Sequence, residues 1–372
     1  MPVKVVIFID WFAPAYKAGG PVQSIVNLVN QPIEGVEYKI ICSNKDLDGS
    51  LLQGVAYDEW VKYNLRTQVW YNSNNRAVRN LLKQVSAWQA DVFFINGIYS
   101  LYYNFFPVLF GNAKRKIISA RGMLHAGALS QKGVKKRIYL WIWKLLNIHR
   151  KHAFHATNEE ESVFIKVVFG EKVKVHIAAN LPRILQIPFA HLKKKRLELL
   201  SIGLISPMKN YFQVLKALGQ CKAQVNYTIY GPVKDASYWK ECKDQIEKLP
   251  ANVSVYYRGD LPSAKVPEAL KEAHVFILPS KSENFGHAIY EALSAGLPVI
   301  TSHGTPWNGL KEATAGMNIS PENDYELSEA ICFFAAADET ELVKWSAGAK
   351  AYAEKAIDVR QIENQYRRMF QL

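Results

Sequence analysis

Short apolar runs alternate with amphipathic, helix-like segments along most of the chain. A first set of strand-like runs occupies residues 3–9, 38–42, 67–71, 92–95, 116–119 and 174–178. Strands that alternate with helices form parallel sheets with helices on both faces. The pattern predicts a first α/β domain of the doubly wound type.

The same alternation begins again after residue 198. The second set of runs is Leu199–Gly203, Tyr227–Tyr230, Val253–Tyr256, Val275–Leu278 and Val299–Thr301. Between the two sets, Asn180 to Arg196 contains two prolines and a lysine run, a composition typical of a linker. We therefore expect two Rossmann-like domains facing each other across a cleft, spanning residues 1–183 and 198–346, with a linker at 184–197. In such folds ligands bind at the carboxyl ends of the strands.

The segment after the run Val275–Leu278 carries two carboxylates around a predicted strand-to-helix turn. Glu283 lies in the loop, and Glu291 lies eight residues later on the helix. The amides of Asn284, Phe285 and Gly286 precede the helix, where unpaired N–H groups and the helix dipole favour an anion such as phosphate. Gly286 also permits close approach of the backbone to a ligand.

Two further turns offer groups for an anion. Lys209 follows the strand ending at Gly203, and its ammonium group can stabilise a diphosphate leaving group, although a lysine in a turn is more often merely solvated. Gly19 and Gly20 follow the first strand, and Pro21 fits the first position of a helix. The two glycines would let an anion approach that helix start.

Arg121 and His125 follow the predicted strand at 116–119. An arginine in this position can bind phosphate, and a histidine can transfer an acceptor proton. For either residue taken alone, a structural role is the more common one.

The blocks Ser282–Gly286 and Glu291–Ile300 together resemble the E-x7-E signature of glycosyltransferase family 4, the retaining GT-B "group 1" enzymes. The resemblance implies that Glu283 contacts the donor sugar. It also implies that the amides of Asn284–Gly286 hold sugar and phosphate, and that Glu291 holds the ribose hydroxyls.

Other segments extend this resemblance. Residues 201–210 are similar to the family's G-R-x-S-P-x-K block, which implies that Lys209 touches donor phosphate. Leu204 stands where that block has an arginine, so another cation such as Arg258 is expected to help. Gly231 lies in a shortened form of the family's G-x-G-P element near the donor.

The first half of the chain resembles the family more weakly. Gly19 and Gly20 agree with an N-terminal glycine loop that reaches donor phosphate and acceptor, and Ser119–Leu124 resembles an S-P-R-G-M-L segment. The resemblance implies that the first domain binds the acceptor, that the second binds the nucleotide sugar, and that residues 347–372 form a helix crossing back to the first domain.

These features predict a retaining hexosyltransferase that uses a UDP- or GDP-linked sugar without a metal, with Glu283, Lys209, His125 and Arg121 as candidate catalytic residues. The expected acceptor is a hydroxyl of a lipid-linked surface glycan, as in polysaccharide or lipopolysaccharide biosynthesis. Three alternatives remain open: another donor reaction on the same fold, a degenerate protein that binds donor without turnover, as Leu204 suggests, and a basic membrane- or nucleic-acid-binding protein.

The formal net charge of +13 suits an acidic partner. Much of it gathers between Lys132 and His152, around the apolar run Ile138–Trp143. Such a segment fits a helix in a membrane interface and, equally, a core helix with solvated ends. No nucleic-acid motif is present.

The four cysteines lack metal-ligand spacing, and the N-terminus lacks a signal-peptide pattern. We therefore expect a cytoplasmic location. Peripheral contact with the inner face of the membrane is left open.

Overall fold

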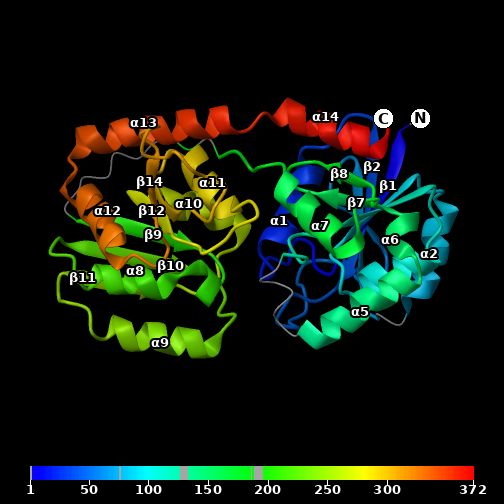
Figure 1. The fold of residues 1–372 in the computed structure, drawn as a ribbon, viewed down its shortest axis with the longest axis horizontal. Helices are drawn as coiled ribbons and strands as arrows, with labels where there is room; N and C mark the ends of the chain where they lie inside the picture. The colour runs from blue at the N-terminus through cyan, green and yellow to red at the C-terminus, as the bar shows by residue number, and fades with distance from the viewer. Residues whose placement is uncertain (1, 75–76, 126–132, 186, 188–195) are drawn as a thin grey trace. The chain divides into compact units, whose positions relative to one another are not determined.

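The computed structural model describes residues 2–74, 77–125, 133–185, 187 and 196–372. Lys132, lysines 193–195 and most of the expected linker lie outside them. The chain divides into two compact units, whose helices and strands are drawn in Figure 1 with colours that follow the residue number. The first unit contains Met1–Leu181 and Val359–Leu372, and the second contains Pro182–Asp358.

The first unit is built on an eight-stranded sheet with the order β3-β4-β2-β1-β5-β6-β7-β8. Its strands are β1 (Val3–Phe8), β2 (Val36–Ser43), β3 (Trp60–Lys62), β4 (Thr67–Asn72), β5 (Val92–Asn96), β6 (Arg115–Ser119), β7 (Ala153–Ala156) and β8 (Val175–Ile177). All pairings among them are parallel except β3 with β4. The sequence pattern missed β3 and β7, because both are short and neither contains a long apolar run.

Helices on both faces cover this sheet. They are α1 (Gly20–Asn30), α2 (Val78–Ala87), the π-helix η2 (Leu101–Phe105), α3 (Phe106–Phe110), α5 (Gly133–Leu145), α6 (Ile148–Lys151), α7 (Glu159–Phe169) and α14 (Val359–Phe370). α14 comes from the end of the chain and packs by Tyr366 and Phe370 against Phe94 of β5. Arg115 donates hydrogen bonds to the last carbonyls of α14, which further attach it to the sheet.

The second unit contains a parallel six-stranded sheet with the order β11-β10-β9-β12-β13-β14. The strands are β9 (Leu197–Ile202), β10 (Val225–Tyr230), β11 (Val253–Tyr257), β12 (Val275–Leu278), β13 (Val299–Ser302) and β14 (Gly316–Ile319). β14 was not expected from the sequence, since Gly316 and Asn318 interrupt its apolar pattern. Gly316 is needed there because a Cβ at this position would lie 1.9 Å from the carbonyl oxygen of Val299.

The helices of the second unit also lie on both faces. They are η3 (Pro207–Lys209), α8 (Tyr211–Leu218), α9 (Ala236–Ile246), η4 (Ser263–Lys265), α10 (Val266–Lys271), α11 (His287–Ser294), α12 (Asp324–Ala336) and α13 (Glu339–Ala356). The closing segment, expected as one helix, is two helices that are separated at Ile357 and Asp358. α13 packs in the second unit through Trp345, whose ring meets Phe333 and Phe334.

Both sheets reverse their winding direction at one place, which we call the switch point. In the first unit it lies between β1 and β5, and in the second between β9 and β12. Chain segments leave the two strands in opposite directions there, so the loops after them separate and leave space for a ligand. Among the described residues, no helix has the length and apolar character needed to cross a membrane.

Candidate functional site

Lys209 and Glu283 meet at the switch point of the second unit. The turn η3 after β9 carries Lys209, and the loop after β12 carries Glu283. The Nζ atom of Lys209 donates to Oε1 of Glu283, and the two side chains are 20% and 11% exposed. The fold therefore joins two residues that the sequence had singled out separately, and it places a cation and a carboxylate where this topology binds ligands.

Backbone hydrogen bonds hold both loops in place. The amide of Lys281 donates to the carbonyl of Met208 over 2.8 Å, which ties the loop after β12 to the turn after β9. The amide of Glu283 donates to the carbonyl of Gly304 over 3.1 Å. Because each loop is held by main-chain contacts, the charged pair is presented in a defined position before any ligand arrives.

The turn from Glu283 into α11 depends on Gly286. This residue has φ of 75°, a left-handed conformation that glycine adopts without strain, and it directly precedes the helix. Trp307 fixes the turn from the other side, since its Nε1 donates to the carbonyl of Phe285 over 2.5 Å and the two rings meet edge to face. The segment Asn284–Gly286 therefore lies at the start of α11, as the sequence predicted, with Trp307 as a supporting residue.

Glu291 lies on α11 and is only 6% exposed. Burial raises its pKa to about 7, against the opposing influence of the positive charge of Arg183. A carboxylate in this environment favours a ligand that donates hydrogen bonds to it, because such bonds stabilise the charged form. Ribose hydroxyls are ligands of this kind.

Arg183 is the charged residue near Glu291 that the sequence did not reveal. Its Nη1 donates to both the carbonyl oxygen and Oγ of Ser263, each over 2.8 Å, so the guanidinium is held in place. The residue lies just before the expected linker, in a segment without periodicity. No local pattern distinguishes it from a solvated arginine, and only the fold brings it close to α11.

The remaining donor-site candidates of the second unit lie at the ends of β10 and β11. Gly231 packs against the main chain of Gly203, where a Cβ would come within 1.9 Å of the carbonyl oxygen, so it permits the close approach of two loops. Arg258 is exposed, and its guanidinium lies over the ring of Tyr256 at 5.3 Å. Its strand β11 is two strands away from β9, about 10 Å across the sheet. Leu204 is half-buried and adds no charge.

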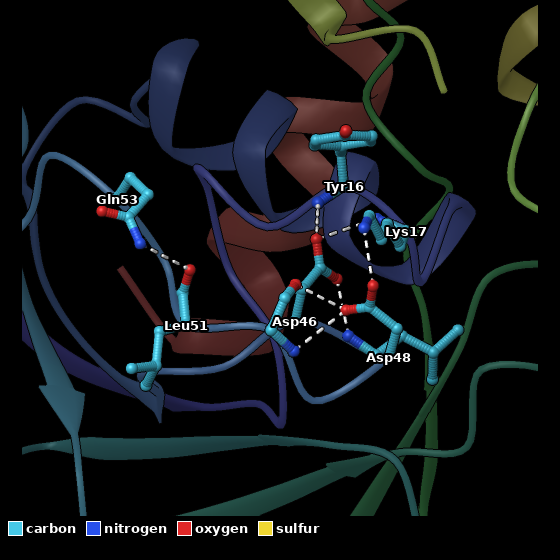
Figure 2. Close-up of polar contacts among 8 residues, drawn as sticks. Tyr16, Lys17, Asp46, Asp48, Leu51 and Gln53 are labelled. Atoms are coloured by element: carbon cyan, nitrogen blue, oxygen red, sulfur yellow. Dashed lines mark hydrogen bonds and ion pairs between the residues drawn. The ribbon is translucent and has the colours of Figure 1, made fainter. Parts of the chain in front are cut away.

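In the first unit, Gly19 and Gly20 form the start of α1, with Gly19 at φ of 72° and Pro21 in the first turn. The loop before them is anchored by two aspartates, as Figure 2 shows: Oδ2 of Asp46 accepts from the amides of Tyr16 and Lys17, and the Lys17 ammonium pairs with Asp48 at 2.6 Å. The sequence predicted this glycine turn but not the carboxylates that hold it.

Asp10 and Ser100 meet at the switch point of the first unit, and the sequence had suggested neither as a site residue. Asp10 follows β1 and Ser100 follows β5, and the serine hydroxyl donates to Oδ1 of the aspartate over 2.6 Å. Burial raises the pKa of Asp10, which the bond from Ser100 partly offsets. A carboxylate directly after a first strand gives no recognisable pattern in a sequence.

Arg121 and His125 are placed differently from one another. Arg121 donates to Oδ1 of Asn96 and to Oδ1 of Asn180, and it also bonds Tyr366 of α14. This network joins the turn after β6 to β5, to the segment after β8 and to α14, and it favours a structural role for the arginine. The ring of His125 meets Phe164 edge to face at 4.8 Å.

Within the described ranges there is no cluster of three or more histidine, cysteine or acidic side chains suited to a metal ion. In the second unit, the Lys209 ammonium and the main-chain amides at the start of α11 are groups that could act on an anion. Glu283 and Glu291 provide acceptors for hydroxyl groups.

Comparison with known families supports this description. Residues 184–351 match the family model described as "Glycosyl transferases group 1". The matched segment lies in the second unit and includes Lys209, Glu283 and Glu291. It supports membership of this part of the chain in the superfamily of group 1 glycosyltransferases.

Curated relatives are similar over parts of the chain. The alpha-monoglucosyldiacylglycerol synthase of Streptococcus pneumoniae is 32% identical over 109 residues, covering 29% of this chain and 24% of that protein. The putative colanic acid biosynthesis glycosyltransferase WcaL of Escherichia coli is 28% identical over 153 residues, covering 39% of this chain and 38% of that protein. The chain thus matches well under half the length of these relatives.

Solved structures resemble the chain over its whole length. HepE from Anabaena, crystallised with UDP and glucose, gives a TM-score of 0.73 with 16% identity and 99% coverage of both chains. Sucrose-phosphate synthase from Thermosynechococcus elongatus also gives 0.73, with 13% identity and coverage of 100% of this chain and 98% of that one. The fold is that of the GT-B glycosyltransferases, with two Rossmann-like units built on parallel sheets.

Proposed function

We propose that the protein is a retaining glycosyltransferase of family 4 that transfers a hexose-type sugar from a nucleotide-diphosphate donor to a hydroxyl group. The observation that carries this proposal is the pair Lys209–Glu283 at the switch point, followed by buried Glu291 on α11. A nucleotide sugar has three matching parts: an anionic diphosphate for Lys209, sugar hydroxyls for Glu283 and ribose hydroxyls for Glu291.

A uridine nucleotide is the donor we favour over a guanosine nucleotide. Structures of the neighbour HepE contain UDP and UDP-glucose. Lys209, Glu283 and Glu291 in the second unit suit the diphosphate, sugar and ribose that every nucleotide-sugar donor shares, so the preference for uridine rests on this neighbour alone.

Each residue of the Lys209–Glu283 ion pair has its own role during the proposed reaction. A bound diphosphate attracts the Lys209 ammonium, and Glu283 is then released to accept a hydrogen bond from the donor sugar. In the retaining reaction, the bond between the anomeric carbon and the diphosphate oxygen breaks. The acceptor oxygen attacks from the same face, and its proton passes to the departing diphosphate. Lys209 and the amides at the start of α11 stabilise the negative charge that develops on that diphosphate. We propose that this positive field acts without a metal ion.

A lipid-linked surface glycan is the acceptor class we propose, within polysaccharide or lipopolysaccharide biosynthesis and at the cytoplasmic face of the membrane. The name of WcaL connects that relative with colanic acid biosynthesis, and the name of the pneumococcal relative connects it with a glucosyldiacylglycerol. Both names fit a transferase that works on membrane-bound acceptors.

The test is calorimetric titration of the purified protein with UDP, GDP, ADP and CDP in the presence of EDTA, followed by assay of donor hydrolysis and transfer with the sugars of the base that binds. We expect UDP to bind and a UDP-hexose to turn over without added metal. Binding without turnover would favour the degenerate donor-binding protein that Leu204 suggests. Absence of nucleotide binding would overturn the proposal and favour a basic binding protein.

A further inference from the structure

Helix α5 has two apolar faces, of which one is buried. Leu140 and Trp143 point into the core of the first unit, at 7% and 0% exposure. Four other large apolar residues remain in solvent: Val134 is 71% exposed, Ile138 56%, Trp141 61% and Leu145 63%. Core packing accounts for the first group and leaves the second without a structural role.

The four exposed residues form one continuous stripe, which we call the α5 stripe. They are spaced four, three and four positions apart. Because successive residues of an α-helix are rotated by about 100°, all four fall within about 60° of the helix circumference. The buried face with Trp143 lies on the opposite side. Single exposed apolar side chains are ordinary, but a stripe of this length on one helix marks an interaction surface.

Basic side chains flank the α5 stripe on both sides. By the same rotation, Lys135 lies on one side of it, and Arg137 and Lys144 lie on the other. Lys136 belongs to the buried side instead, where its ammonium lies 5.2 Å from the ring centre of Tyr99. From Gly133 to Lys151 the chain contains six lysines and arginines and no acidic residue.

We propose that α5 docks on the surface of a bilayer that contains anionic phospholipid. The helix would lie in the plane of the interface, with the α5 stripe among the upper acyl chains and Lys135, Arg137 and Lys144 at the phosphate groups. This is the arrangement of interfacial amphipathic helices, whose binding combines buried apolar area with attraction to anionic lipid. With 13 residues, α5 is far too short to span the bilayer.

A membrane fits this surface better than a protein partner for two reasons. Aliphatic side chains and a tryptophan between cations need no partner of complementary shape, and a bilayer supplies both an apolar layer and a layer of phosphates. This inference adds a partner to the lipid-linked acceptor of the proposed function, and its test does not depend on catalysis.

The experiment measures flotation of the full-length protein with vesicles of phosphatidylcholine alone and with vesicles that contain one-third phosphatidylglycerol. We expect binding to the anionic vesicles that weakens as the salt concentration rises. The variant K135Q/R137Q/K144Q should lower the partition coefficient roughly 100-fold, since each basic residue near an anionic surface contributes about fivefold. The variant I138S/W141S should lower it by at least about tenfold.

The matched control is V163S/V167S on α7. Val163 and Val167 are also exposed, at 54% and 75%, but their helix begins with three glutamates. The control should bind vesicles as the wild type does. An equal loss in the control, or unchanged binding of both α5 variants, would overturn the proposal.

Two further measurements keep the interpretation unambiguous. Light scattering without lipid should show the same mass for the wild type and I138S/W141S. A wild-type dimer that the variant dissociates would show that the stripe binds a second copy of the chain, which would also overturn the proposal. UDP affinity should be equal in all variants, because none of the substituted residues is a candidate for binding the nucleotide. If no UDP binds to any of them, the proposed function fails, but the vesicle result stands.

Discussion

The switch points of the two units share a topology but differ in chemistry. In the second unit, the loops after β9 and β12 bring together Lys209 and Glu283, a cation and an anion. In the first unit, the loops after β1 and β5 bring together Asp10 and Ser100, a carboxyl group and a hydroxyl group. The same strand reversal thus presents two opposite charges in the second unit. In the first unit it presents a carboxyl group beside a neutral hydroxyl group.

This difference indicates which ligand each unit can accept. Lys209 can exchange its carboxylate partner for a diphosphate, because both are anions that the ammonium group attracts. Asp10 repels a phosphate and instead favours neutral hydroxyl groups, which can donate to its oxygens. In the first unit Arg121, which the sequence suggested as a phosphate-binding cation, is already bonded to Asn96 and Asn180. We infer that the strand reversal sets where a ligand would bind in each unit, and that the residue types set which chemical groups it would need.

The largest effect is expected at Glu283. Replacing it with Gln keeps the size of the side chain but removes the charge, and we expect transfer to fall by at least about 100-fold because an oriented contact to the reacting sugar is lost. UDP affinity should change little or increase slightly, since Lys209 loses its competing partner. Steady-state transfer rates together with calorimetric UDP binding measure both effects, and normal turnover in the variant would remove Glu283 from the site.

Lys209 should control binding of the diphosphate. Lys209→Ala removes one charged hydrogen bond, so UDP affinity should fall about 10- to 100-fold. Lys243→Ala on α9 is the control, because Lys243 is exposed on another part of the same unit. Titration of UDP against uridine sharpens the result: uridine affinity should be nearly equal in the wild type and the Lys209 variant. A parallel loss for uridine would point to misfolding.

A change at Asp10 tests the ligand that we infer for the switch point of the first unit. Asp10→Asn retains an oxygen that can accept from Ser100, and we expect KM for the acceptor to rise about tenfold with UDP affinity unchanged. Kinetics with varied acceptor concentration, alongside UDP titration, separate the two units. Weaker UDP binding in this variant would show that the two switch points do not divide their ligands as we infer.

Glu291 should make UDP binding depend on pH. Its pKa of about 7 means that the carboxylate is mostly protonated at pH 6 and mostly charged at pH 8. Ribose hydroxyls bind the charged form better, so UDP affinity should rise by up to about tenfold over this interval. Glu291→Gln should flatten the difference, while the titration of the UDP phosphate itself remains in both proteins. Identical pH profiles would contradict the assignment.

The same residue affects the stability of the ligand-free protein. Burial raises the pKa of Glu291 from the ordinary 4.5 to about 7, so between these values the folded state binds more protons than the unfolded state. Its contribution to the free energy of unfolding therefore decreases as the pH rises through this window, by about 3 kcal/mol in all. Thermal melts should show Glu291→Gln more stable than the wild type at pH 8 and similar to it at pH 4.5.

Much of the fold followed from the sequence because its strands are buried on both faces. β5 and β12 contain the continuous apolar runs Val92–Ile95 and Val275–Leu278, as expected of strands in a parallel sheet covered by helices. The sequence pattern missed β3, β7 and β14, because these strands are short or interrupted by polar residues and glycine. They are held by pairing with neighbouring strands rather than by a pattern of their own.

Local spacing identified the candidate residues whose position depends on one turn. Gly286 before α11, Glu291 on that helix and Gly19 before α1 each lie where a strand-to-helix turn must place them. The sequence predicted the α5 stripe only in part. It showed an apolar helix with basic ends, but it did not show which of the side chains face the core.

By itself, the sequence determined the parallel α/β character of the chain and the turns that carry its separate polar groups, since both depend on short-range periodicity and backbone conformation. The tertiary structure alone decided which of those groups meet. The pairing of Lys209 with Glu283, the contact of Asp10 with Ser100, the enclosure of Arg121 and the place of Arg183 near Glu291 all join segments distant in the chain. The order of strands in a sheet sets such meetings, and no local spacing encodes that order.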